Sequence, residues 1–390
     1  MNSMKYAAIT ERLAHTGGAK WAIHQRCRAM KAEGADIIEL TIGEPDQPPD
    51  PQLFEVCHQS MLAGRTGYSS GRGEQELLEA IATRYARRRP GVDAANVLCF
   101  PGTQTALFAT MMALTGPGDG VLVGDPFYAT YEGVILASGA HRESVALRPE
   151  YGFRLNADDL EAAITPQSRV LLLNSPHNPT GAVLTTDDVA KIGAVCKKHD
   201  LWIIADEVYE ELVFDGTFAS PFDNPDLADR VIAVSSISKS HAAPGFRSGW
   251  AVGPHEFCEK LLPLSETMLF GNQPFIADMT AFALNSDLQT SARMRESYKY
   301  RANLFADTLG KLEGITAYRP QAGMFIVLDV AGTGLDGEKF AWRLLEAGVA
   351  VMPGSSFGDN AGNLVRLSLT VPDESVVEAC NRIARFVENL

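Results

Sequence analysis

Four short apolar runs, each followed at once by polar residues, constrain the fold of this 390-residue chain more than any other feature. The runs are Val121 to Gly124, Arg169 to Leu173, Leu201 to Ala205 and Val231 to Val234. They do not alternate with polar residues, which is typical of parallel strands covered by helices on both faces. The carboxyl ends of such strands lie at one edge of the sheet. The sequence therefore predicts an α/β fold with a ligand site at that edge.

The last run leads into the segment Ser235 to Trp250, where one lysine stands among four serine hydroxyls. Lys239 lies just beyond the expected strand end, after Ser235, Ser236 and Ser238 and before Ser240, and Arg247 follows eight residues later. Burial and a nearby cation both lower the pKa of an ammonium, and the neutral amine can form a Schiff base with a carbonyl. Arg247 and the serines can also hold a phosphate. A solvated lysine on a surface turn is the alternative, but the whole segment is more specific than one residue.

A second predicted anion site lies where a strand, Asn96 to Phe100, turns into an apolar helix, Ala106 to Leu114. The free N–H groups and the positive dipole end of a helix N-terminus favour an anion. Thr103, Gln104 and Thr105 can add side-chain donors there. Capping of the helix by Thr103 or Thr105 is the alternative and does not exclude phosphate binding. No Gly-x-Gly-x-x-Gly stands at this turn, so it is not a dinucleotide-binding fingerprint.

Four polar or aromatic residues follow the other strand-like runs. Asp206 can pair with a protonated pyridine nitrogen, although an isolated aspartate there is as often a helix cap. Asn178 and Tyr209 can hydrogen-bond a phenolic oxygen, and Tyr128 can stack on a ring. Taken singly, Asn178 reads as a turn residue and the two tyrosines as core or interface aromatics. Together they indicate one aromatic, anionic ligand.

Three further positions are candidates with equally plain alternatives. Arg366 stands in the middle of an alternating strand, where a buried guanidinium needs an anion such as a substrate carboxylate. A lone arginine there would more often form an internal salt bridge or lie at an exposed edge. Gly43 lets a backbone N–H approach a ligand closely, although a simple turn is favoured. Tyr68, in a Gly-rich loop, is either functional or merely exposed.

The length exceeds what one hydrophobic core usually supports, so two domains are expected. Residues 46–285 would form the large α/β domain. Residues 286–390 change character and predict a compact α+β unit that includes a strand from Val349 to Met352. The arm and the strand within residues 1–45 would complete this unit. No internal repeat and no low-complexity segment is found.

Composition excludes several classes of function. The net charge of -14 disfavours nucleic acid as a partner. No apolar run approaches the ~18 residues that span a bilayer, and the first residues do not form a signal peptide, so no membrane association is expected. Six scattered cysteines without a Cys-x-x-Cys pair predict reduced thiols in a cytoplasmic protein. No histidine has the spacing of a metal ligand set, so no metal is expected.

Eight motifs in order over nearly the whole chain resemble the class I/II aminotransferases, pyridoxal-phosphate (PLP) enzymes of fold type I that are similar to aspartate aminotransferase. They are Ile-Gly-Glu-Pro at 42–45, Gly-Tyr at 67–68, Gly-Thr-Gln at 102–104, Pro-Phe-Tyr at 126–128, Asn-Pro-Thr-Gly at 178–181, Asp-Glu-Val-Tyr at 206–209, the lysine segment and Arg366. The resemblance implies a large domain with a mostly parallel seven-stranded sheet and a smaller α+β domain.

The resemblance also implies a role for each candidate residue. Lys239 would carry the cofactor as a Schiff base and transfer the proton, Asp206 would bind the pyridine nitrogen, and Tyr128 would stack on the ring. Tyr209 and Asn178 would bind the ring hydroxyl oxygen. The phosphate ligands would be Gly102, Thr103, Gln104, Ser236, Ser238 and Arg247, with Tyr68 supplied by the neighbouring subunit of a homodimer. Arg366, the Gly43 backbone and Asn178 would bind the α-carboxylate of the substrate.

The implied reaction moves an amino group from an L-amino acid to a 2-oxo acid in two half-reactions. A PLP-dependent β-carbon–sulfur lyase on the same fold is the nearest alternative, because the cofactor site alone does not separate the two. A catalytically silent ligand-binding homologue is a third, although the lysine is present. One departure bears on the substrate: some aspartate-specific relatives have a lysine where this chain has only Thr103, Gln104 and Thr105. A neutral or broad donor is therefore expected.

Overall fold

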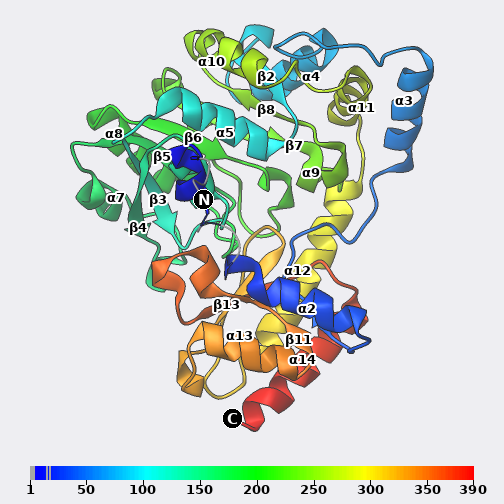
Figure 1. The fold of residues 1–390 in the computed structure, drawn as a ribbon, viewed down its shortest axis with the longest axis vertical. Coiled ribbons are helices and arrows are strands. Elements are labelled where there is room, and N and C mark those ends of the chain that lie inside the picture. The colour runs from blue at the N-terminus through cyan, green and yellow to red at the C-terminus, as the bar shows by residue number, and fades with distance from the viewer. Residues whose placement is uncertain (1–4, 15, 17–18) are drawn as a thin grey trace.

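The structure, a computed structural model that describes residues 5–14, 16 and 19–390, places all four apolar runs in one mixed seven-stranded sheet (Figure 1). The strand order is β2-β8-β7-β6-β5-β3-β4, in which β7, β6, β5, β3 and β4 run parallel and β8 is antiparallel to both neighbours. The strands are β2 (Val97–Phe100), β3 (Gly120–Asp125), β4 (His141–Ala146), β5 (Ser168–Asn174), β6 (Trp202–Asp206), β7 (Val231–Ser236) and β8 (Gly249–Val252).

Each central strand is buried on both faces because successive side chains point to opposite sides. In β6, for example, Ile203 and Ala205 belong to one core and Ile204 to the other. One face is covered by α5 (Thr103–Leu114), α6 (Tyr131–Ala137) and α10 (His255–Met268). The other face packs against α3 (Pro51–Leu62), α4 (Gln75–Ala86), α7 (Ala157–Ala163), α8 (Thr186–Lys198) and α11 (Pro274–Asn285). This arrangement accounts for the absence of polar alternation in the runs.

A second sheet and a separate core are formed by the two ends of the chain. The antiparallel order is β12-β13-β10-β9, and the N-terminal strand β1 pairs in parallel with β11, Ile38 opposite Val349. The helices are α2 (Ala22–Ala32), α12 (Thr290–Leu309), α13 (Gly337–Glu346) and α14 (Asp373–Glu388), and the strands are β1 (Ile38–Glu39), β9 (Thr316–Tyr318), β10 (Phe325–Asp329), β11 (Val349–Ala350), β12 (Met352–Pro353) and β13 (Leu364–Ser368). Figure 1 shows α2 beside this C-terminal unit, with α12 running up towards the large sheet.

Two elements differ from the sequence-based expectation. The helix after β2 begins at Thr103 rather than Ala106, because Gly102 adopts φ 85° and turns the chain directly into the helix. The strand expected over 349–352 is divided, since β11 pairs with β1 whereas β12 pairs with β13. The chain therefore changes sheets at Val351. The N-terminal α1 (Ala8–Leu13) lies against α6.

The six cysteines are buried and free of disulfides. Within the described ranges, no helix combines the length and the apolar character required to cross a bilayer.

Candidate active site

A cavity of about 910 Å³ opens where the large sheet meets the C-terminal unit. Strand ends β5, β6 and β7 contribute Asn174, Asp206 and Ser236, and the other unit contributes Phe325 and Arg366. The cavity therefore lies at the carboxyl edge of the parallel strands, as predicted. Its full lining is Trp21, Ile42, Gly43, Thr103, Gln104, Leu107, Tyr128, Tyr131, Asn174, Asn178, Asp206, Val208, Tyr209, Ser236, Ser238, Lys239, Pro244, Arg247, Phe325 and Arg366.

Lys239 lies on α9 (Ile237–Ser240), a single helical turn directly after β7. Its Nζ donates a hydrogen bond to the carbonyl oxygen of Gly43 at 2.5 Å, so the N-terminal segment contacts the helix after β7 at this amine. Burial lowers the pKa of Lys239 to about 8; the charge of Glu44 raises it, and those of Arg366 and Arg247 lower it. A buried amine that loses its proton near pH 8 is a suitable nucleophile and base.

The phosphate side of the cavity is formed by the start of α5 and the serines around Lys239. The hydroxyl of Thr103 is buried, with no hydrogen-bond partner among the described residues. A Cβ on Gly102 would stand 2.1 Å from Nη2 of Arg247, so a larger residue there would displace that guanidinium. Buried hydroxyls without partners are costly. A phosphate held here by Thr103, the α5 N–H groups and Arg247 would satisfy them.

Gln104 is oriented differently from the other predicted phosphate ligands. It lines the cavity, yet its Oε1 accepts a hydrogen bond from Thr130 Oγ1 at 3.0 Å. Ser236 and Ser238 are buried, and the Ser236 hydroxyl accepts from the N–H of Ser238 at 3.3 Å. The Ser236 hydroxyl thus caps α9 while also facing the cavity.

Asp206 is buried at the end of β6, and burial raises its pKa to about 6. Two hydrogen bonds oppose that rise: Tyr131 Oη donates to Oδ2 at 2.7 Å, and the N–H of Val208 donates to Oδ1 at 3.2 Å. The aspartate therefore also orders the turn after the strand, as its alternative reading expected. A protonated pyridine nitrogen placed against this carboxyl would keep it ionised.

Asn178 and Tyr209 lie together, with Asn178 Nδ2 donating to Tyr209 Oη at 3.5 Å. Burial raises the pKa of the Tyr209 hydroxyl well above its ordinary value, so it stays protonated and can donate. Tyr128 lines the same cavity, its ring edge-on to Tyr131 at 5.5 Å. All three residues line the cavity, as a site for an aromatic ligand would require.

Arg366 is 3% exposed and sits between two aromatic rings, with its guanidinium carbon 3.8 Å from the ring centre of Phe325 and 4.5 Å from that of Phe357. It donates to Asn178 Oδ1 at 3.0 Å and to the carbonyl of Thr41 at 2.7 Å. Among the described residues no carboxylate pairs with this guanidinium, and its Nε has no hydrogen-bond partner. Burial lowers the pKa of Arg366 to about 10. A buried guanidinium in these surroundings is suited to bind an anionic ligand.

Two predicted residues do not line the cavity: Gly102, which directly precedes the lining residue Thr103, and Tyr68. Tyr68 is 93% exposed and lies against Phe270, 5.8 Å between ring centres. Among the described residues of this single chain it contributes nothing to the cavity lining. No group of three or more metal-ligating side chains is found in the part of the chain that the structure describes.

Sequence reasoning missed two residues of the site. Tyr131, three residues after Tyr128, binds Asp206, and Asn174 donates to the carbonyl of Asp206 at 3.0 Å while accepting from the N–H of Asn178 at 2.8 Å. Asn174 carries a usable signal, since it ends its strand as Asp206 ends the next. Tyr131 carries none, because it begins a helix and only packing brings it to Asp206.

Comparison with known proteins adds an independent line of evidence. The sequence profile of the family "Aminotransferase class I and II" matches residues 35–383. The arginine–pyruvate transaminase of Pseudomonas aeruginosa is 43% identical over 98% of both chains. An aspartate/prephenate aminotransferase of Cereibacter sphaeroides is 33% identical over 95% of this chain and 96% of that protein. The structure of Thermus thermophilus aspartate aminotransferase with maleate superimposes with a TM-score of 0.92 at 30% identity, covering 98% of this chain and 100% of that one.

Proposed function

Since the chain belongs to the class I and II aminotransferase family, we propose that the cavity described above is its active site and that the candidate residues have the roles their geometry suggests. The chain is a PLP-dependent aminotransferase that acts on amino acids and 2-oxo acids. The observation that carries the site assignment is the convergence of three buried groups on one cavity: the amine of Lys239, the carboxyl of Asp206 and the guanidinium of Arg366.

The cofactor fits the donors and the carboxyl that line the cavity, among them the buried Thr103 hydroxyl that has no partner among the described residues. When bound, PLP supplies an electron sink for the charge that develops at the substrate Cα. Thr103, Ser238 and Arg247 would hold its phosphate, and Asp206 its ring nitrogen. Lys239 would bond to the cofactor at rest; once released, its Nζ would take the proton from Cα and return it to the neighbouring carbon of the cofactor.

Substrate orientation would depend on Arg366. Its two terminal nitrogens donate to Asn178 and Thr41 in the structure, and its Nε has no hydrogen-bond partner among the described residues. A planar guanidinium can bind a carboxylate through two parallel hydrogen bonds. Arg366 would therefore hold the α-carboxylate of both substrates, assisted by Asn178 and the backbone at Gly43, and so present Cα to Lys239.

The donor is proposed to be neutral or basic rather than strictly acidic. The cations that line the cavity are Lys239, Arg247 and Arg366, and each already has a role, so none is left for a second carboxylate. An adjoining hollow that shares Ile42 with the cavity is lined by Glu39, Glu44 and Asp46 together with His24 and Arg28. Glu39 pairs with His24 and Asp46 with Arg301, whereas Glu44 forms no ion pair among the described residues and could bind a cationic side chain. The name of the 43% identical relative also supports L-arginine as a donor and pyruvate as an acceptor.

The assembly is proposed to be a cytoplasmic homodimer with shared active sites. Tyr68 projects from its loop, and Phe54, Leu62 and Phe270 are 49%, 70% and 60% exposed. Exposed large apolar side chains of this kind mark protein contacts. Tyr68 of each protomer would reach the phosphate of the other. The proposed units are the arm and part of the small domain (1–45), the large domain (46–285) and the small domain (286–390); the separate core of the C-terminal unit supports this division.

A single-turnover experiment tests the proposal. Without an acceptor, a donor that has no leaving group should convert the yellow protein once, stoichiometrically, to a colourless amine form, and a 2-oxo acid should restore the colour. Lys239→Ala should fold but lose turnover by several orders of magnitude. The aminotransferase relatives favour this outcome over the lyase alternative. Steady release of pyruvate and ammonia from a cysteine conjugate, with no colour cycle for any donor, would contradict the proposal.

A donor panel tests the substrate class separately. Without a fixed second cation, aspartate should not exceed neutral donors by more than about tenfold in kcat/KM, or ~1.4 kcal/mol. Arginine should be at least as good as alanine. A larger preference for aspartate would show that another cation serves the site. Sedimentation of the purified protein tests the dimer, and a fully active monomer would exclude shared sites.

A further inference from the structure

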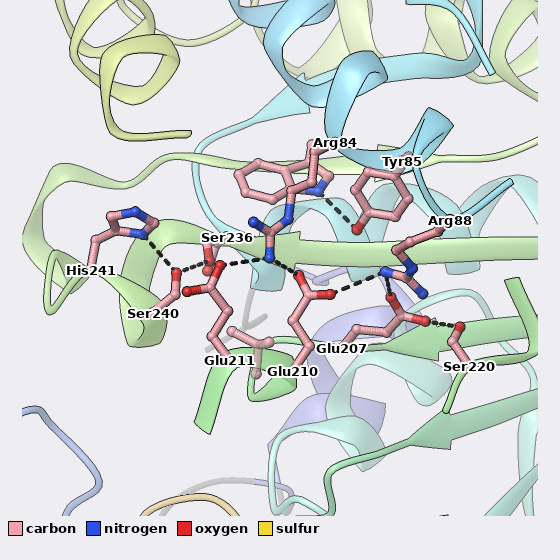
Figure 2. Close-up of polar contacts among 12 residues, drawn as sticks. Arg84, Tyr85, Arg88, Glu207, Glu210, Glu211, Ser220, Ser236, Ser240 and His241 are labelled. Atoms are coloured by element: carbon pink, nitrogen blue, oxygen red, sulfur yellow. Dashed lines mark hydrogen bonds and ion pairs between the residues drawn. The ribbon is translucent and has the colours of Figure 1, made fainter. Parts of the chain in front are cut away.

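Behind the strand end that carries Asp206 lies a partly buried ion cluster, which we define as Arg84, Arg88, Glu207, Glu210 and Glu211. Figure 2 shows the two arginines, which belong to the end of α4 and the turn after it, facing the three glutamates. The glutamates follow β6 in sequence, so a helix and a strand end more than a hundred residues apart are joined by charge. None of the five side chains lines the cavity.

Arg88 makes the most contacts in the cluster. Its Nη1 lies 2.8 Å from Glu207 and 3.0 Å from Glu210, and its Nε lies 2.7 Å from Asp223. Arg84 extends the cluster with contacts of 3.0 Å to Glu210 and 2.6 Å to Glu211. The Glu207 side chain is 2% exposed and also accepts from the hydroxyl of Ser220. The cluster is therefore buried at Glu207 and reaches solvent at Arg84 and Glu211, whose side chains are 26% and 23% exposed.

Stability alone gives no reason for burying so many charges. Desolvation offsets much of the attraction within a buried pair, and apolar residues of similar volume often stabilise a fold equally well. What buried pairs add is a fixed geometry, because their hydrogen bonds are directional and a displaced partner leaves an uncompensated charge. The question is then which geometry the cluster sets.

The cluster residues alternate with two site residues in sequence. Asp206 faces the cavity while Glu207 binds Arg88, and Tyr209 faces the cavity while Glu210 binds both arginines. Strand geometry sends the side chains of Asp206 and Glu207 to opposite sides. A shift of either glutamate would therefore move a group that contacts the bound ring.

The same turn also supports the lysine. The short helix η4 (Glu210–Leu212) packs against α9, which carries Lys239. The negative charge of Glu211 acts on His241, and His241 Nδ1 lies 2.8 Å from the hydroxyl of Ser240 (Figure 2). The turn held by the cluster therefore adjoins both the strand end that carries Asp206 and the helix that carries Lys239.

We propose that Arg88 is a positioning residue, which holds Glu207 and Glu210 and thereby sets where Asp206 and Tyr209 meet the cofactor. The inference rests on the proposed roles of Asp206 and Tyr209. Arg88 touches neither cofactor nor substrate and acts only through these neighbours. A lysine in its place would keep the charge but not the planar fork that binds two carboxylates at once.

The test compares Arg88→Lys with Arg230→Lys. Arg230 also binds two carboxylates, Asp200 and Asp229, but stands just before β7 at the opposite ends of the strands. Arg88→Lys should weaken PLP binding to the apoprotein at least tenfold, lower kcat at least tenfold, and shift the pH midpoint of the bound cofactor's absorption. KM for both substrates should stay within threefold, because Arg366 is untouched. Arg230→Lys should leave all of these within twofold.

Two results would overturn the inference. One is a folded Arg88→Lys protein with unchanged PLP affinity and absorption midpoint, whatever its unfolding midpoint in urea. If Arg88→Lys does not fold, Glu210→Gln replaces it, and we expect that variant to lose at least threefold in PLP affinity. The second overturning result is an unchanged PLP affinity in Glu210→Gln. The variant Asp206→Asn distinguishes a failure of the proposed function from a failure of the positioning role alone. If it leaves the absorption and turnover intact, the proposed function fails too; if it disrupts both while Arg88→Lys does not, only the positioning role is wrong.

Discussion

The hydroxyl of Tyr131 donates a hydrogen bond of 2.7 Å to Oδ2 of Asp206, and both residues are buried. Tyr131 begins α6, and Asp206 ends β6. Burial raises the pKa of this carboxyl and the hydrogen bond lowers it, and the resulting pKa is about 6. One phenol thus helps to keep the aspartate ionised for its proposed contact with a pyridine nitrogen.

Tyr131→Phe should therefore raise the pKa of Asp206 in the apoprotein further. A hydrogen bond to the charged form favours that form, and its loss favours the protonated carboxyl. Carbon-13 NMR titration of the aspartate carboxyls would measure the change. Tyr128→Phe is the matched control, since it removes a hydroxyl from the same cavity that does not bond to Asp206. An unchanged titration of Asp206 in Tyr131→Phe would contradict the assignment of this bond.

Asp206→Asn should stabilise the apoprotein at neutral pH. The folded protein holds the Asp206 proton up to about pH 6, whereas the unfolded chain loses it near 3.8. The wild type therefore loses stability as pH rises between these values, and the loss is complete above pH 6. About two pKa units correspond to about 3 kcal/mol. Urea unfolding at pH 4 and pH 8 should show little difference between the proteins at the lower pH and a more stable variant at the higher. Equal stability at pH 8 would argue against the raised pKa.

Gly102→Ala should lose affinity for PLP beyond the cost of its backbone strain. Gly102 and Gly118 both have positive φ, 85° and 93°, so alanine at either costs about 1–3 kcal/mol. Only at position 102 does the new Cβ meet Arg247, at 2.1 Å; nothing lies within 4 Å at position 118. Calorimetric titration of the apoproteins with PLP should show at least a tenfold loss for Gly102→Ala and near-wild-type affinity for Gly118→Ala. Equal affinities would remove Arg247 from the phosphate site.

Arg366→Leu should raise KM for every amino acid and 2-oxo acid alike. Removal of one partner from a desolvated charge pair costs ~2–5 kcal/mol. The absorption of the bound cofactor should stay the same, because Arg366 is expected to bind the substrate carboxylate and not the cofactor itself. Steady-state kinetics with two donors and two acceptors would measure the effect. If a single substrate suffered, Arg366 would be recognising a side chain instead.

Much of the site was predictable because its groups stand at recognisable places in the chain. Lys239, Asp206 and Asn178 follow apolar runs, and Arg366 interrupts an apolar strand, so local pattern alone indicates them. The mostly parallel sheet was predictable for the same reason, as was the closing of the C-terminal unit by the N-terminal strand. The reach of Tyr68 into a second subunit remains a prediction.

By itself, the sequence determined which residue types end the strands and hence at which edge the chemistry lies, because apolar runs and polar ends are local properties. Only the tertiary structure decided which side chains meet across that edge. Tyr131 reaches Asp206 because α6 packs on the sheet, and Arg88 reaches Glu207 because α4 covers the other face. Neither contact can be predicted from a periodic pattern in the sequence, because the distance between two elements is set by how side chains fill the space between them.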